Sequence, residues 1–75
     1  SALEDQARRQ LASANSNLAS VKYEALSASA RATYDDLRRL IRVAEQNLRI
    51  RNFVFAAELA DKAALLSSLL IKGDA

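Results

Sequence analysis

The sequence has no cysteine, no histidine and no proline, and its only glycine is Gly73. Without cysteine the chain cannot form disulfide bonds or thiolate metal sites. The absence of histidine also excludes the usual zinc sites and every histidine-based acid–base relay. A single glycine excludes glycine-rich phosphate-binding loops as well. We therefore expect a domain that is not an enzyme and that has no cofactor and no metal site.

An excess of charge of one sign and long apolar runs are also missing. The net charge is +2, from eleven Lys and Arg against nine Asp and Glu. So small an excess is a weak argument for nucleic acid as a partner. The apolar runs are far shorter than the roughly 20 residues that a membrane-spanning helix needs. We expect no membrane span.

The first ten residues contain four charged side chains and no apolar segment, which is not the pattern of a signal peptide. Because the chain opens on Ser1 rather than Met, we expect it to be part of a larger protein. The compartment stays open, and both the cytoplasm and a bacterial envelope are compatible with the sequence.

Alanine and leucine dominate what is present, and β-branched residues do not cluster, which favours helix over strand. The 75 residues are 51% hydrophobic and 27% charged, a composition typical of a folded chain. This length allows one domain with a thin core. Ser1 and Glu4 have the spacing of a capping box, and Lys72 before Gly73 is a helix stop signal. We expect a single all-α domain over residues 1–75.

The clearest internal boundary lies at Asn52. Before it, apolar residues recur at helical spacing: Tyr34, Leu37, Leu40, Ile41, Ala44 and Leu48. After it, a second helix is apolar over most of its circumference and must be covered by more than one neighbour. Asparagine suits the link, because it tolerates the left-handed conformation and also caps helices. The pattern predicts an antiparallel helical hairpin.

Before this hairpin, small apolar residues alternate at intervals of three and four. This seam comprises Leu11, Ala14, Leu18, Val21, Ala25 and Ala28. Such residues allow two helix backbones to approach closely, as in a coiled coil. The spacing shifts near Thr33, which with Asp36 resembles an N-cap. Since no Gly or Pro breaks the pattern, we expect one helix over about residues 2–50, slipped or broken near residue 33. A second helix should cover about residues 53–72.

A helix over residues 2–50 would be about 70 Å long, and the last helix would cover only about 30 Å of it. A second copy of the chain, or another helical protein, would cover the rest, and a two-fold interface supplies both missing contacts at once. We expect a homodimeric helical bundle; the alternative is a monomeric three-helix bundle with a turn between Lys22 and Thr33. The candidate interface residues are Leu11, Ala14, Leu18, Val21, Ala25, Ala28, Phe53, Phe55, Leu66 and Leu70.

The last helix contains the pattern Asn52-Phe53-x-x-Ala56-x-x-Leu59-Ala60-x-Lys62-Ala63-x-x-Leu66. This pattern resembles the second helix of a tetratricopeptide-type hairpin, and Ala44 stands where that family has a small residue at the helix crossing. The resemblance covers about one repeat of 34 residues. Leu40, Asn47 and Ser68 depart from it, since they replace the usual Trp, Tyr and Pro. The pattern is also similar to helical domains of bacterial envelope proteins. The resemblance implies a closely packed hairpin.

Six arginines and three acidic residues lie between Arg31 and Arg51. Arg38, Arg42 and Arg49 share one helix face, which could hold phosphates or an acidic partner. Acidic residues stand among them, and we expect no aromatic side chain between them of the kind that stacks on bases. The function that we expect is therefore dimerisation or another protein–protein interaction. The alternative is binding of an anionic ligand or nucleic acid by the arginines.

Overall fold

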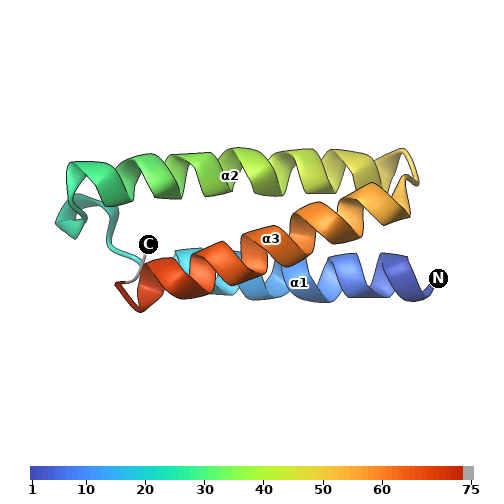
Figure 1. The fold of residues 1–75 in the computed structure, drawn as a ribbon, viewed down its shortest axis with the longest axis horizontal. Helices are drawn as coiled ribbons and strands as arrows, with labels where there is room; N and C mark the ends of the chain where they lie inside the picture. Colours follow the sequence, from blue (N-terminus) through green and yellow to red (C-terminus); the bar gives the residue numbers. More distant parts are fainter. Residues whose placement is uncertain (74–75) are drawn as a thin grey trace.

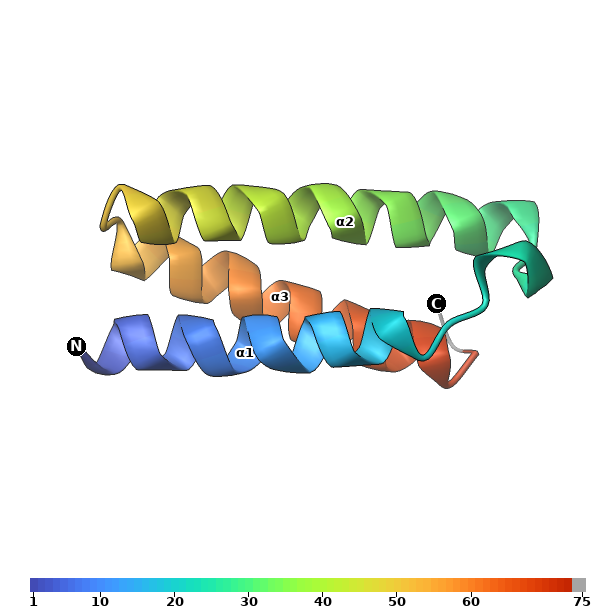
Figure 2. The same cartoon turned by 180° about the vertical axis from the view of Figure 1, so that it is seen from behind.

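The computed structural model describes residues 1–73. The chain forms α1 (Ala2–Ala19), the short 3-10 helix η1 (Tyr23–Ala25), α2 (Ala28–Arg49) and α3 (Phe53–Ile71). Residues 1–73 contain no strand, so the expected all-α class is confirmed. The long helices α1 and α2 run antiparallel, and α3 crosses diagonally over both of them (Figure 1). Seen from behind, α1 and α2 lie side by side with α3 beyond them (Figure 2).

The single helix expected over about residues 2–50 is wrong. The chain leaves α1 at Ala19 and turns back through residues 20–27 before α2 begins. Thr33, near which we expected a slip or break, lies inside α2, where its Oγ1 donates to the carbonyl oxygen of Ser29 at 3.3 Å. The physical reason for the turn is burial, because folding back places the apolar side of α1 on α3. The alternative of a three-helix bundle is confirmed.

Serine side chains mark the beginnings of the first two long helices. The Oγ of Ser1 accepts from the backbone N–H of Glu4, and the Oγ of Ser27 accepts from that of Ala30, each at 3.1 Å. Arg31 then fixes η1 against α2. Its guanidinium donates to the carbonyl oxygens of Tyr23 at 3.1 Å and Glu24 at 2.7 Å. The turn therefore has its own hydrogen bonds, although no Gly or Pro is present in it.

The link between α2 and α3 is a tight turn with two characteristic backbone bonds. The N–H of Asn52 donates to the carbonyl oxygen of Asn47 at 2.8 Å, and that of Arg51 to Leu48 at 3.0 Å. This is the pattern of a Schellman motif. The left-handed residue is Arg51, with φ of 65°, and not Asn52 as expected. Asn52 does cap α3, since its Oδ1 accepts from the N–H of Phe55 at 3.5 Å.

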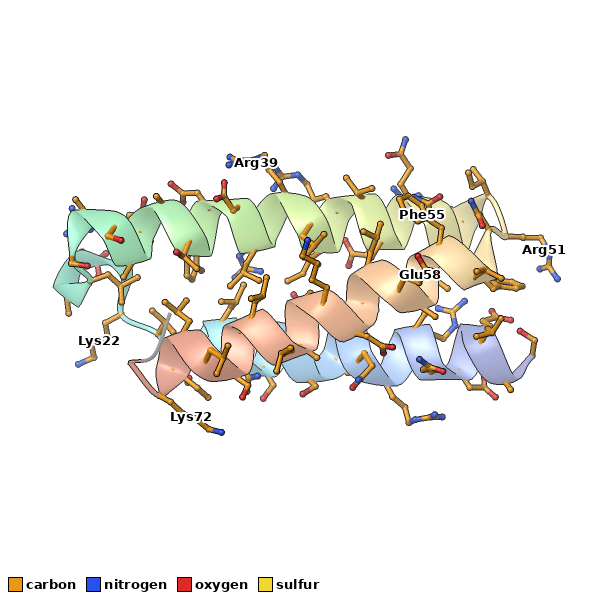
Figure 3. All side chains as sticks on the ribbon, in the orientation of Figure 1. Lys22, Arg39, Arg51, Phe55, Glu58 and Lys72 are labelled. Carbon is orange, nitrogen blue, oxygen red and sulfur yellow. The ribbon has the colours of Figure 1, made fainter. Side chains whose placement is uncertain are left out.

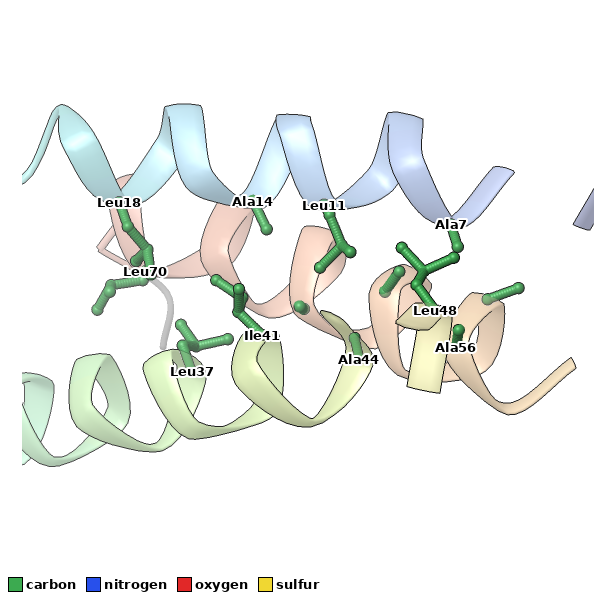
Figure 4. Packing of buried hydrophobic residues seen from close by; sticks show 13 residues of the cluster. Ala7, Leu11, Ala14, Leu18, Leu37, Ile41, Ala44, Leu48, Ala56 and Leu70 are labelled. Atoms are coloured by element: carbon green, nitrogen blue, oxygen red, sulfur yellow. The ribbon is translucent and has the colours of Figure 1, made fainter. Parts of the chain in front are cut away.

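The core lies where the three helices meet, and α3 contacts both α1 and α2 far more than these two contact each other. Leucine and isoleucine from α1 and α2 point toward one another, and α3 contributes mainly alanine (Figure 4). Alanine lets helix backbones approach closely while still removing apolar surface from water. The buried core consists of Ala7, Leu11, Ala14, Leu18, Leu37, Ile41, Ala44, Leu48, Ala56, Ala57, Ala60, Ala63 and Leu70.

Candidate interaction surfaces

Four of the expected interface residues lie inside a single chain. Leu11, Ala14, Leu18 and Leu70 are buried in the core between the helices. Their placement between two copies was therefore wrong. The seam is a true close-packing surface, but its neighbours are α2 and α3 of the same chain, because the turn at residues 20–27 brings them there.

The second half of the expected seam does not pack in this way. Val21 is half-buried, whereas Ala25 in η1 and Ala28 at the start of α2 are exposed. The alternation of three and four is a helical pattern, and it loses its meaning where the chain leaves the helix at residue 20. Ala25 and Ala28 are therefore not buried between helices as the seam predicted.

The remaining expected residues belong to α3. Phe53 and Leu66 are half-buried against the core. Phe55 is 42% exposed, and the large apolar side chains Val54 and Leu65 are 58% and 61% exposed. We define the outer face of α3 as Val54, Phe55, Glu58, Lys62 and Leu65, all of which are exposed. Figure 3 shows Phe55 and Glu58 on the side of α3 that is turned away from α1.

A groove lies beside this face, where α3 diverges from α2. Its volume is about 480 Å³, and Thr33, Asp36, Leu37, Leu40, Lys62 and Leu66 line it. Three of these residues are leucines, and one acidic and one basic side chain flank them. Lys62 belongs both to the groove and to the outer face of α3. The two features therefore form one continuous surface.

The arginine face expected on α2 is only partly free. The guanidinium of Arg38 donates to the hydroxyl of Tyr34 at 3.0 Å and to Oδ1 of Asn15 at 3.4 Å, so this arginine joins α2 to α1. Arg42 and Arg49 are exposed, and within residues 1–73 neither takes part in an ion pair. They line a shallow hollow of about 630 Å³ together with Arg39, Val43, Glu45 and Gln46.

Aromatic side chains do lie among the arginines, contrary to expectation. The guanidinium of Arg38 stands 5.3 Å from the ring centre of Tyr34, and that of Arg31 stands 5.4 Å from Tyr23. The two tyrosine rings meet edge to face at 5.2 Å. Spacing along the sequence could have placed Tyr34 beside Arg38 on one helix face. Tyr23 could not be placed, because the sequence left open whether the helix continues after Lys22 or a turn follows it.

Tyr23 also makes a polar contact that affects its ionisation. Its hydroxyl donates to Oδ2 of Asp35 at 3.1 Å. This hydrogen bond to the carboxylate raises the pKa of Tyr23, and desolvation acts in the same direction. At the other end of the bundle, the hydrogen bond from Arg8 lowers the pKa of Glu4. Both contacts hold surface side chains in place.

In the part of the chain that the structure describes, no three acidic side chains come together as metal ligands. Over the same residues, no helix combines the length and apolarity that crossing a membrane requires. No protein-family model, curated protein or solved structure matches this chain. The likeness to a tetratricopeptide-type hairpin therefore stays a prediction.

Proposed function

We propose that this domain is a non-enzymatic protein–protein interaction module that associates with a second copy of itself through the outer face of α3. The observation that supports this most directly is the exposure of Val54, Phe55 and Leu65 on one helix face. Single exposed apolar side chains are ordinary on protein surfaces. Here Val54 and Phe55 lie at one end of the face and Leu65 at the other, with Glu58 and Lys62 between them, and a contact site can use such a combination of apolar and charged side chains.

The outer face of α3 lies opposite the side that packs into the core of the same chain. That opposite side is buried as Ala56, Ala57, Ala60 and Ala63, whereas Phe55 is 42% and Val54 58% exposed. Burying apolar surface against a partner is favourable by about 25 cal/mol per Å². The groove beside the face adds further apolar surface through Leu40 and Leu66. Association would therefore remove from water what folding leaves exposed.

The test is the molar mass of the domain in solution, measured by light scattering after gel filtration over a broad concentration range. We expect a dimer that dissociates on dilution. Leu65→Ser should raise the dimer dissociation constant by about tenfold, because it removes the most exposed apolar side chain of the outer face from the contact. The matched control is Ile50→Ser, since Ile50 is 68% exposed but lies at the end of α2. A wild-type chain that stays monomeric throughout would refute the proposal.

A second candidate function is binding of an anionic ligand or nucleic acid at Arg42 and Arg49. The observation that favours it is that both side chains are exposed around one hollow. The test is titration of a DNA duplex at low and rising salt, with Arg42→Gln/Arg49→Gln as the variant and the exposed Arg9→Gln as control. Affinity that falls steeply with salt and is lost in the double variant would support it. No binding at low salt would exclude it.

A further inference from the structure

We infer that two copies pair through antiparallel α3 helices, with Glu58 of each copy facing Lys62 of the other. This inference rests on the proposed function, because it specifies how the outer face of α3 meets its partner. The partner is a second copy rather than an unrelated helix, since the same face carries both halves of each expected contact.

The outer face of α3 carries charges of both signs. Glu58 and Lys62 lie four residues apart in α3, which places them one turn apart on one side of the helix. Both are exposed, and neither takes part in an ion pair within residues 1–73. The outer face therefore presents one unpaired negative group beside one unpaired positive group. A two-fold axis between such groups pairs each with its opposite in the other copy.

Pairing Glu58 with Lys62 also fixes the register of the two helices. In an antiparallel pair, a residue three positions before Glu58 faces one three positions after Lys62. This alignment places Phe55 of each copy opposite Leu65 of the other. Apolar side chains thus meet apolar side chains on both sides of the charged centre. One alignment satisfies the charges and the apolar positions together, and it repeats by symmetry at the other end of the contact.

The same charges oppose a parallel arrangement of the two helices. Two α3 helices running in the same direction in register would place Glu58 beside Glu58 and Lys62 beside Lys62. Like charges at such positions oppose association, whereas opposite charges steer the partners together and fix their register. The charge pattern therefore selects the antiparallel pair.

Charge reversal tests the inference on the full chain. Glu58→Lys alone places four cations at the centre of the contact, and Lys62→Glu alone places four anions there. We expect each single variant to raise the dimer dissociation constant by about tenfold or more, and the double variant to restore it to near the wild-type value. Lys22→Glu is the matched control for Lys62→Glu, because it makes the same change from lysine to glutamate in the turn between α1 and α2, away from the outer face of α3 (Figure 3).

The outcomes separate this inference from the proposed function. A wild-type dimer that tolerates both single reversals, or a double variant that fails to recover, would overturn the antiparallel pairing and leave self-association standing. A monomeric wild-type chain would overturn both. Thermal unfolding of each variant at low concentration verifies that the fold is intact. Added salt should weaken the wild-type dimer and strengthen the single variants, since it screens attraction and repulsion alike.

Discussion

The side-chain amide of Asn17 donates to Oγ of Ser67 at 3.0 Å, across the contact between α1 and α3. Ser67 is fully buried, and its hydroxyl in turn donates to the carbonyl oxygen of Ala64 at 3.1 Å. The hydroxyl is therefore satisfied both as donor and as acceptor. A polar pair of this kind fixes how α1 is positioned on α3, because the small alanine side chains alone discriminate little between alternative positions of the two helices.

Asn17→Ala should lower the free energy of unfolding by about 1 kcal/mol, because the buried hydroxyl of Ser67 loses its donor. Urea unfolding followed by circular dichroism measures the change. Ser16→Ala is the matched control, since Ser16 is the exposed neighbour in α1, and it should change stability by less than about 0.5 kcal/mol. Equal effects of the two variants would contradict the role assigned to the Asn17–Ser67 bond.

Two alanines of the expected seam should respond differently to enlargement. Ala14 is fully buried, and Ala14→Leu should destabilise the fold by about 1–3 kcal/mol through overpacking. Ala25 is exposed in η1, so Ala25→Leu should leave stability within about 0.5 kcal/mol of the wild type. The melting temperatures of the two variants, compared with that of the wild type, test this difference. A large loss of stability in Ala25→Leu would contradict this, and would mean that the turn packs against a partner outside the single chain.

Ala14 and Ala25 differ because the sequence predicted the buried sides of the helices but not where the first helix ends. Helical periodicity identified the buried sides of α1 and α2. Leu11 and Leu18 lie on one face of α1, and Leu37 and Ile41 lie on one face of α2. It failed at the turn, because Ser27 caps α2 within a segment rich in serine and alanine. Nothing in that local pattern distinguishes a capping serine from one inside a helix.

The candidate surfaces were foreseen to a similar degree. An excess of apolar residues on α3 was visible from composition, and Val54, Phe55 and Leu65 are indeed exposed. The partition of the expected interface between core and surface could not be foreseen, since it depends on how α1 folds back. Arg38 illustrates the same point, because its contact with Asn15 exists only after that turn.

The left-handed backbone of Arg51 makes another prediction. A side chain in this conformation costs about 1–2 kcal/mol, a cost that glycine does not carry. Arg51→Gly also removes the guanidinium that lies 5.2 Å from the ring centre of Phe53, worth about 0.5 kcal/mol at an exposed site. We expect a net stabilisation of up to about 1 kcal/mol. Arg42→Gly, at an exposed position in the interior of α2, should instead destabilise by about 1 kcal/mol. Thermal unfolding of both variants tests this contrast.

The hydrogen bond between Tyr23 and Asp35 predicts a dependence of stability on alkaline pH. Because the pKa of Tyr23 is raised in the folded chain, its protonated form is favoured there over the unfolded chain. The resulting stabilisation is complete below the usual tyrosine pKa of about 10 and is lost as pH rises through the folded value. The melting temperature of the wild type should therefore fall between neutral and strongly alkaline pH more than that of Tyr23→Phe, which keeps Tyr34. Asp35→Asn should move the absorbance titration of Tyr23 to lower pH, since the carboxylate that favours the protonated hydroxyl is gone. Parallel pH profiles for the wild type and Tyr23→Phe would show that this bond does not hold the turn.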